Sequence, residues 1–172
     1  MTAGDPSQLY DLFLYSIRDI YGAENHLIRS FPKMKSWSGA KQLRLAIDQH
    51  YEITKGHIVR LLKVFEILDE KPVPIKSEAM HGILADGEHA IETTAGQTAV
   101  RDLAISLACQ KIECHEMIVY KGLSNLATTL GHLEVASLFN QTFREEQESA
   151  NILSGMTEIL TNKAISGNQF VN

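Results

Sequence analysis

The sequence predicts an all-α protein: a four-helix bundle whose two halves are joined by a long crossover that carries a short extra helix. Apolar residues recur every three or four positions along four long stretches, which is the spacing of a buried helix face. No stretch shows the two-residue alternation that is typical of a strand. In addition, single glutamates interrupt several apolar rows, at positions where a packed helix face is normally uncharged.

The first two helices follow from their apolar rows and from the residues at their ends. The first is expected to begin at Pro6, because proline suits a first helical turn, and to end near Phe31. A loop through residues 37–39 should follow. The second helix is expected at about 40–68, with its apolar residues on one face.

Proline and glycine then mark the remaining boundaries. Pro72 and Pro74 impose an extended crossing, which begins a crossover at about 69–96. Gly131 is well suited to close a helix in a left-handed conformation. The other three helices are therefore expected at about 77–93, 100–130 and 132–165.

Length, composition and charge limit the class of protein. With 172 residues, 44% of them hydrophobic and 22% charged, the chain suits one domain. We place this single domain at residues 1–165 and expect a loose tail at 166–172. The net charge is −5 and the basic residues are dispersed, which argues against a nucleic-acid partner. No stretch approaches the roughly 18 apolar residues of a membrane span, so no membrane partner is predicted.

The N-terminus and the cysteines indicate a compartment. Residues 1–8 lack a basic region followed by an apolar core, so no secretory signal is predicted. Cys109 and Cys114 lie roughly 140° apart around one predicted helix and are poorly placed to bridge each other. We therefore predict free thiols, with Cys114 as a small core residue, and a cytoplasmic protein.

An internal repeat supports a bundle built from two hairpins. Shifting the chain by 92 positions (116 − 24) aligns Glu24 with Glu116 and places residues 66–68 on the identical residues 158–160. Helical heptads produce part of this agreement by chance. A true duplication predicts a pseudo-twofold bundle in which Glu24 and Glu116 face each other across a shared centre.

Three glutamates lie within inward apolar rows. Glu24 falls in line with Ile20 and Leu27, Glu116 interrupts the row of the third long helix, and Glu146 interrupts that of the fourth. An ionised carboxylate that is buried alone is strongly disfavoured, so it needs a cation, a proton or a hydrogen-bonded partner. Several carboxylates that converge from different helices are typical of a di-metal site in a four-helix bundle.

Five blocks of sequence also carry a family resemblance. They are LYDLFLYSIRDIYGAENHL from Leu9, QHYEITKGHIVRL from Gln49, EAMHGILADGEHAIE from Glu78, VRDLAISLACQKIECHEMIVY from Val100 and FREEQESANIL from Phe143. Together they resemble the ferritin-like stress proteins of the YciF type over about residues 9–160. The resemblance implies a rubrerythrin-like bundle, usually dimeric, with a di-iron centre and a link to stress responses.

This resemblance suggests a set of metal ligands. A ferritin-like centre takes one Glu from each of two helices and a Glu-x-x-His pair from each of the other two. The candidate ligands of iron or manganese are Glu24, His50, His57, Glu113, Glu116 and Glu146. We expect Glu24 with Glu113 or Glu116 to bridge two metal ions, and the two histidines and Glu146 to be terminal ligands. Glu145 and Glu148 are expected to be solvated.

Two positions depart from the family pattern. Ile53 stands where the family usually has Glu, and Ala150 stands where it usually has Asp. Both changes remove a carboxylate from places that should line the bundle centre, so affinity for two divalent ions should fall. We therefore favour a weak or degenerate metal centre.

Other polar residues are given simpler roles. Three histidines are expected at the surface, namely His26, His115 and His132. Two histidines on the crossover helix, His81 and His89, give a weak indication of a second metal site. Three tyrosines are candidates to donate hydrogen bonds to the carboxylates, with plain packing as the alternative: Tyr10, Tyr21 and Tyr120.

Two hypotheses of function remain open. In the first, a carboxylate-bridged metal pair reacts with oxygen or peroxide, and so oxidises Fe(II) or removes an oxidant. In the second, a metal-free helical homodimer acts through protein contacts during stress, with its buried carboxylates protonated or paired with His50, His57 or Lys111. The inward glutamates favour the first hypothesis, and Ile53 and Ala150 favour the second.

Overall fold

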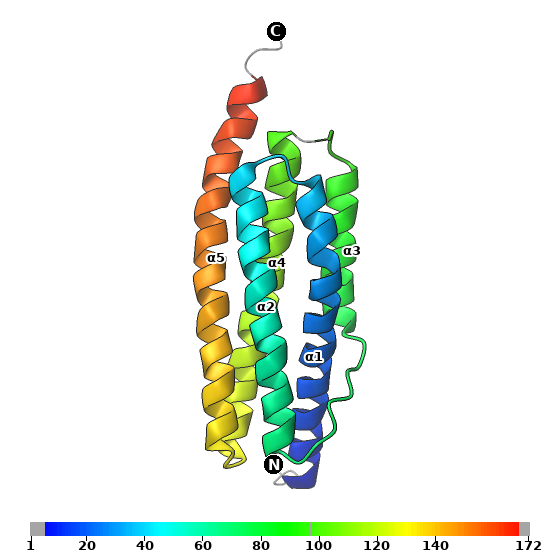
Figure 1. Cartoon of the computed structure of the whole chain (residues 1–172), viewed down its shortest axis with the longest axis vertical. Coiled ribbons are helices and arrows are strands. Elements are labelled where there is room, and N and C mark those ends of the chain that lie inside the picture. The colour runs from blue at the N-terminus through cyan, green and yellow to red at the C-terminus, as the bar shows by residue number, and fades with distance from the viewer. Residues whose placement is uncertain (1–5, 97, 169–172) are drawn as a thin grey trace, which may run out of the picture.

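Four long helices lie side by side as a bundle, and a shorter helix packs against one flank of it (Figure 1). The computed structural model describes residues 6–96 and 98–168, and every regular element in these ranges is a helix. The elements are α1 (Pro6–Trp37), α2 (Lys41–Ile67), α3 (Glu78–Glu92), α4 (Ala99–Thr129) and α5 (Leu133–Asn168). The predicted all-α bundle with a helix-bearing crossover is confirmed.

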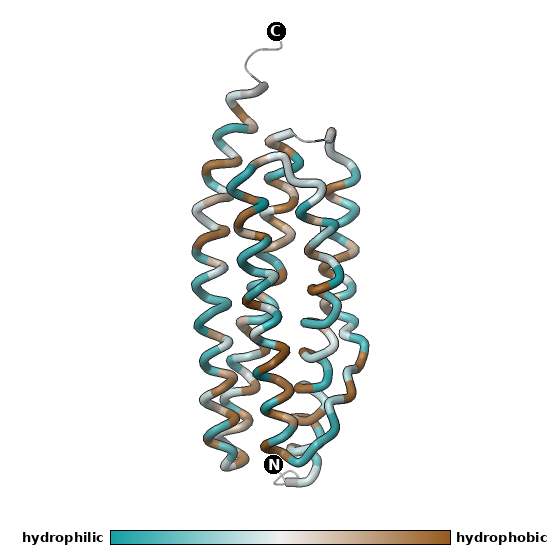
Figure 2. The backbone as a smooth tube through the Cα atoms, viewed as in Figure 1, coloured by the Kyte–Doolittle hydropathy of each residue, from teal (hydrophilic) through white to brown (hydrophobic). Residues whose placement is uncertain are grey.

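The bundle consists of two antiparallel hairpins. Figure 1 shows α1 turning back into α2, and α4 turning back into α5, with α3 outside the four long helices. The segment after α2 runs back along α1, and α3 then packs mainly against α4. Along each long helix apolar and polar residues interchange every few positions (Figure 2), as expected for helices with one buried face.

The hydrophobic core is contributed by all four long helices. Its largest fully buried side chains include Phe13, Phe65, Tyr120 and Phe139, one from each long helix. No helix in the described part of the chain combines the length and the hydrophobicity that crossing a bilayer requires. Both cysteines are free as predicted, but Cys114 is exposed and not a core residue, because α4 turns it toward solvent.

A buried carboxylate away from the bundle centre ties the two hairpins together. Asp102 on α4 is only 4% exposed. Its two oxygens accept hydrogen bonds from the backbone N–H groups of Gly39, at 2.7 Å, and Ala40, at 2.8 Å. Gly39 and Ala40 directly precede α2, so Asp102 fixes the turn that leads into that helix from another part of the sequence. Local sequence patterns give no sign of this contact.

Two helices are longer than their patterns predict. α1 continues six residues past Phe31, through Pro32, to Trp37. Proline removes one backbone hydrogen bond, but burial of Met34 on the same face as Phe31 offsets that loss. α5 continues to Asn168, past the predicted domain end at residue 165. The rest of the predicted tail, 169–172, lies outside the described residues.

Two glycines occupy positions that other residues fit poorly. Gly131 has φ of +84° between α4 and α5, which confirms the predicted left-handed helix end. Gly22 lies where the crossover backbone touches α1, and Ile75 N–H donates to the Arg18 carbonyl at 3.2 Å. A Cβ on Gly22 would lie 1.8 Å from the Ile75 carbonyl oxygen. The close approach of the crossover therefore requires glycine at this position.

Replacing Gly22 with alanine should destabilise the protein. The clash is with backbone and cannot be relieved by a rotamer change, so Gly22→Ala should lower the free energy of unfolding by about 3 kcal/mol. Gly56→Ala is the matched control, since a Cβ there meets no atom within 4 Å. That control should gain about 1 kcal/mol from helix propensity. Urea unfolding measures both values, and equal effects would contradict the packing described here.

Candidate metal centre

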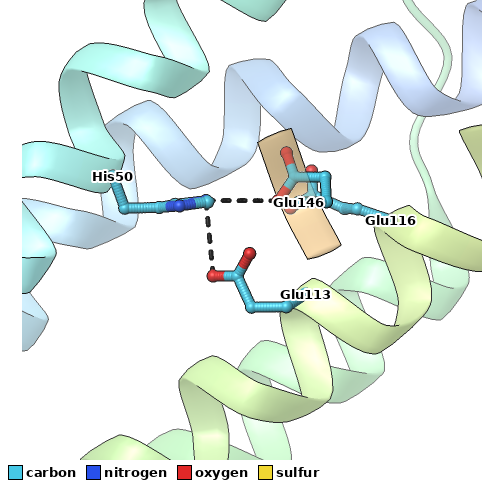
Figure 3. A group of neighbouring side chains, drawn as sticks. All are labelled: His50, Glu113, Glu116 and Glu146. Atoms are coloured by element: carbon cyan, nitrogen blue, oxygen red, sulfur yellow. Dashed lines mark ion pairs between the residues drawn. The ribbon is translucent and has the colours of Figure 1, made fainter. Parts of the chain in front are cut away.

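All six candidate ligands lie buried at the middle of the bundle. α1 supplies Glu24, α2 supplies the two histidines, α4 supplies Glu113 and Glu116, and α5 supplies Glu146. None of the six side chains is more than 6% exposed. Figure 3 shows the His50, Glu113, Glu116 and Glu146 side chains directed toward one another. The sequence pattern thus found the inward residues on all four long helices, although their role as ligands stays a prediction.

The six residues form two overlapping groups. The first group comprises His50, Glu113, Glu116 and Glu146, and the second comprises Glu24, His57 and Glu146. Within each group, one donor atom per residue lies within 4.8 Å of all the others. Glu146 belongs to both groups. It was expected as a terminal ligand, but its position between the groups makes it the better candidate for a bridge.

Several carboxylate oxygens in the two groups lack a hydrogen-bond partner. Both oxygens of Glu116, both of Glu146, and one each of Glu24 and Glu113 are buried and accept no hydrogen bond among the described residues, although Glu146 Oε1 lies 2.9 Å from His57 Nδ1 in an ion pair. Leaving a buried polar atom unpaired costs about 1–3 kcal/mol, and more for a charged group. A divalent cation would satisfy these oxygens together, so the residues present fit a metal centre.

Burial shifts the pKa values of these carboxyl groups upward. Burial raises the pKa of Glu113 and of Glu116 well above the ordinary value, and neighbouring glutamates raise both further. Burial also raises the pKa of Glu24, although His57 opposes the shift. For Glu146 burial acts in the same direction, but the contacts with His57, Glu113 and His50 together outweigh it and lower the pKa. Without a cation, Glu113 and Glu116 therefore keep their protons to higher pH than exposed glutamates do.

His57 is surrounded by three glutamates. Its Nδ1 lies 2.9 Å from Glu146 and 3.3 Å from Glu24, close enough for ion pairs but poorly aligned for hydrogen bonds. Its Nε2 lies 3.0 Å from Glu145 Oε2. Burial alone would lower the pKa of His57, but the three carboxylates together raise it to about 12. In the metal-free protein His57 is thus the positive charge of the second group.

Glu145 was expected to be solvated, and that expectation is wrong. It is partly buried, and both its oxygens accept hydrogen bonds from the Arg60 guanidinium at 2.9 Å. The contact with His57, followed by that with Arg60, lowers the pKa of Glu145 to about 2. Arg60 lies three residues after His57, on the same face of α2. This spacing is the one signal in the sequence that could have indicated that Arg60 and His57 share a partner such as Glu145.

His50 is held by a different contact. Its Nδ1 lies 3.3 Å from Ser149 Oγ, and its Nε2 lies 3.4 Å from Glu113 and 3.8 Å from Glu146. Burial lowers the pKa of His50, which favours the neutral ring. A neutral ring that donates from Nδ1 to Ser149 presents the lone pair of Nε2 to the first group.

The remaining polar predictions divide. Tyr120 donates a hydrogen bond to Glu24, as predicted, whereas Tyr10 donates to Glu70 outside the centre, and Tyr21 packs against Phe65. Lys111 pairs with Asp86 at the surface and not with the buried carboxylates, because it points out of α4.

The five other histidines take no part in the centre. His26, His115 and His132 were expected at the surface but are half-buried. The two histidines on α3, His81 and His89, are exposed. None belongs to a group of three potential ligands in residues 6–96 and 98–168, so the suggested second metal site on α3 is not supported.

The two positions that depart from the family pattern leave six candidate ligands in place. Ile53 and Ala150 are both half-buried. Even so, the structure brings together four glutamates and two histidines, the same set that a ferritin-like di-metal centre uses. The distribution over the helices differs, because α2 supplies two histidines and α4 supplies two glutamates. The unequal groups follow from this distribution.

Comparison with known proteins agrees with the fold and the resemblance. Residues 8–166 match the model of the family described as "Domain of unknown function (DUF892)". Protein YciF of Escherichia coli (strain K12) is 33% identical over 138 residues, which span 80% of this chain and 82% of that protein.

Solved structures give the same result. The crystal structure of the Escherichia coli stress protein YciF superposes with a TM-score of 0.85 at 30% identity, over 90% of this chain and 98% of that one. YcfI from Rhodopseudomonas palustris superposes with a TM-score of 0.83 at 28% identity, over the same shares. The chain therefore belongs to the DUF892 family of YciF-like helical bundles.

Proposed function

We propose that this protein binds two divalent transition-metal ions, iron or manganese, at two unequal positions in the bundle centre. The observation that carries the proposal is the set of buried oxygens of Glu24, Glu113, Glu116 and Glu146 that accept no hydrogen bond. Carboxylates supply hard oxygen donors and imidazole supplies a nitrogen donor, and iron and manganese ions bind both kinds of donor.

The first group is the stronger of the two positions. It offers three glutamates and the Nε2 atom of a neutral His50. Burial makes it unfavourable for Glu113 and Glu116 to lose their protons when no cation is present. A bound metal ion would supply the positive charge in place of those protons, which would leave on binding. Ser149 keeps His50 oriented for this task.

The second group is the weaker position. It has three ligands, and one of them, His57, carries a proton in the metal-free protein. Nδ1 must lose that proton before it can bind an ion, whereas Nε2 can keep its proton and its contact with Glu145. A carboxylate behind a ligating histidine fixes the ring and raises its basicity. Arg60 and Glu145 would play this supporting part.

A bound iron or manganese pair would supply redox chemistry toward oxygen or peroxide. The protein's own part is to exclude water by burial, to fix His57 through Glu145, and to hold Glu24 through the Tyr120 hydroxyl. We propose that this chemistry serves iron or oxidant handling during stress, in the cytoplasm and as a homodimer. The described relationship to the stress protein YciF supports this setting.

A metal-free scaffold is the second candidate function. One observation favours it: His57 already places a positive charge among Glu24, Glu145 and Glu146, so half of the centre is compensated without an ion. Under this alternative Glu113 and Glu116 stay protonated and the bundle acts through contacts with other proteins. The two candidates differ in their response to pH and to metal.

The metal-free protein should lose stability as pH rises above about 5. Glu113 and Glu116 have raised pKa values in the folded protein. Their contribution to the free energy of unfolding is therefore complete below the pKa of an unfolded glutamate, about 4.3, and is lost as the pH rises above it. His57 acts in the same direction from about pH 6.5 upward. Glu116→Gln needs no proton and should be more stable than the parent at pH 8, by about 1–3 kcal/mol.

Thermal unfolding in the presence of a chelator, followed by circular dichroism, measures this effect. Glu148→Gln is the matched control, because Glu148 is exposed on α5. It should leave the pH profile unchanged. A Glu116→Gln variant that is less stable than the parent at pH 8 would show that Glu116 makes a favourable contact in the metal-free state.

Anaerobic Fe(II) titration should show two unequal steps in the chelator-stripped protein. The first ion should bind at least about tenfold more tightly than the second, because it meets four residues and expels no imidazolium proton. Glu146→Gln should weaken both steps, since Glu146 is shared, whereas Glu116→Gln should weaken mainly the first. Calorimetry with Mn(II) provides an independent measurement. Absence of binding above buffer would favour the scaffold.

A further inference from the structure

A narrow pocket between α2 and α5 reaches from the surface to the first group. Its rim includes Gln49 and Ile152, which are exposed, and its floor includes His50 and Glu113, which are buried. These two helices pack together far less extensively than α4 and α5 do, which leaves the opening between them. We call this feature the α2–α5 pocket.

The size and the lining of the pocket limit what it can hold. Its volume is roughly 40 Å³, and a single water needs about 10–15 Å³ on this scale. The walls include Phe31, Ile53 and Leu153, which offer no hydrogen bonds. An ion would lose its hydration in such a passage without compensation. The pocket therefore suits a molecule of a few heavy atoms without charge.

The floor of the pocket is polar and unpaired. His50 Nε2 and Glu113 Oε2 have no hydrogen-bond partner within the described residues. Both residues belong to the first group, which supplies four protein ligands, fewer than the six of an octahedral ion. A molecule that passes through the pocket thus arrives beside the proposed first metal position.

Ile53 gains a role from this geometry. It lines the pocket together with His50 and Glu113, and its aliphatic side chain keeps that part of the wall apolar. The size and polarity of the side chain at this position therefore affect which molecules can reach His50 and Glu113.

We propose that the α2–α5 pocket is the entry and binding site for a small uncharged molecule, and that Ile53 determines its selectivity. Its role beside a metal ion rests on the proposed function, whereas the passage itself does not. The experiment accordingly has a metal-free arm and a metal-loaded arm.

Cys109 serves as the reporter in the metal-free arm. It lines the pocket and is only 3% exposed. Cys114→Ser removes the exposed thiol and provides the background. In that background, uncharged methyl methanethiosulfonate should label Cys109 at least about tenfold faster than its trimethylammonium-ethyl analogue, after correction for their rates with free cysteine. Mass spectrometry follows the labelling.

Variants of Ile53 test the path itself. Ile53→Phe fills the pocket and should slow labelling by the uncharged reagent at least about tenfold, whereas Ile53→Ala should speed it. Val59→Phe is the matched control, because Val59 is 66% exposed on the same helix and lines no part of the pocket. Circular dichroism checks that each variant folds. If Ile53→Phe does not fold, the labelling rate of Ile53→Ala tests whether the path passes Ile53. Unchanged rates in the Ile53 variants, or no preference for the uncharged reagent, would overturn the proposal.

Nitric oxide is the uncharged probe in the metal-loaded arm. With Fe(II) bound under anaerobic conditions, the parent should give the optical and paramagnetic signals of an iron–nitrosyl complex. Ile53→Phe should bind as much iron as the parent but lose that signal, and Ile53→Glu should bind iron more tightly and also lose it. Iron binding with an unchanged nitrosyl signal in both variants would refute the pocket. A parent that binds no iron would refute the proposed function, while thiol labelling would still decide the passage.

Discussion

The structure depends on one constraint, which is the burial of four carboxyl groups at the centre of a helical bundle. Moving an ionised carboxylate out of water costs several kcal/mol unless it is paired. Glu24, Glu113, Glu116 and Glu146 are each at most 1% exposed, and their charges act on one another. The protein must therefore supply protons, a positive side chain or a metal ion. The raised pKa values of Glu113 and Glu116 and the protonated His57 are two ways in which the charge of the centre is compensated.

The two groups meet the requirement in different ways. The second group contains its own positive charge, because His57 is held among glutamates and backed by Glu145 and Arg60. The first group contains no such charge, since burial keeps His50 neutral. Protons on Glu113 and Glu116 compensate it in the metal-free state. A cation gains more by entering the first group, and this difference is the physical reason to expect unequal sites.

Much of this architecture follows from sequence, and most of the exceptions share one cause, which is contact between segments distant in sequence, whereas Cys114 was assigned to the wrong face of its own helix. Apolar periodicity identified the helices and the inward faces, and the glutamates that interrupt those rows proved to be buried. The contact of Asp102 with the turn before α2, the burial of Met34 that extends α1, and the Arg60–Glu145 pair all depend on a neighbouring helix. Local patterns contain little information about that neighbour.

Ile53 shows how the same limit affects inference about function. From sequence it is an absent carboxylate, and a weaker metal centre is the natural prediction. The structure shows that α4 supplies a second glutamate, and that Ile53 lines a pocket ending at His50 and Glu113. The six candidate ligands named from the sequence lie together, with two glutamates on α4 and two histidines on α2. The pocket beside Ile53 becomes visible only when the helices are seen together.

The most direct test of the central claim is the anomalous diffraction of crystals soaked with Mn(II). Two peaks are expected on either side of Glu146, the stronger one beside His50, Glu113 and Glu116, and the weaker one beside Glu24 and His57 Nδ1. Clear density for the six side chains with no anomalous peak inside the bundle, at manganese concentrations that saturate surface sites, would contradict the claim.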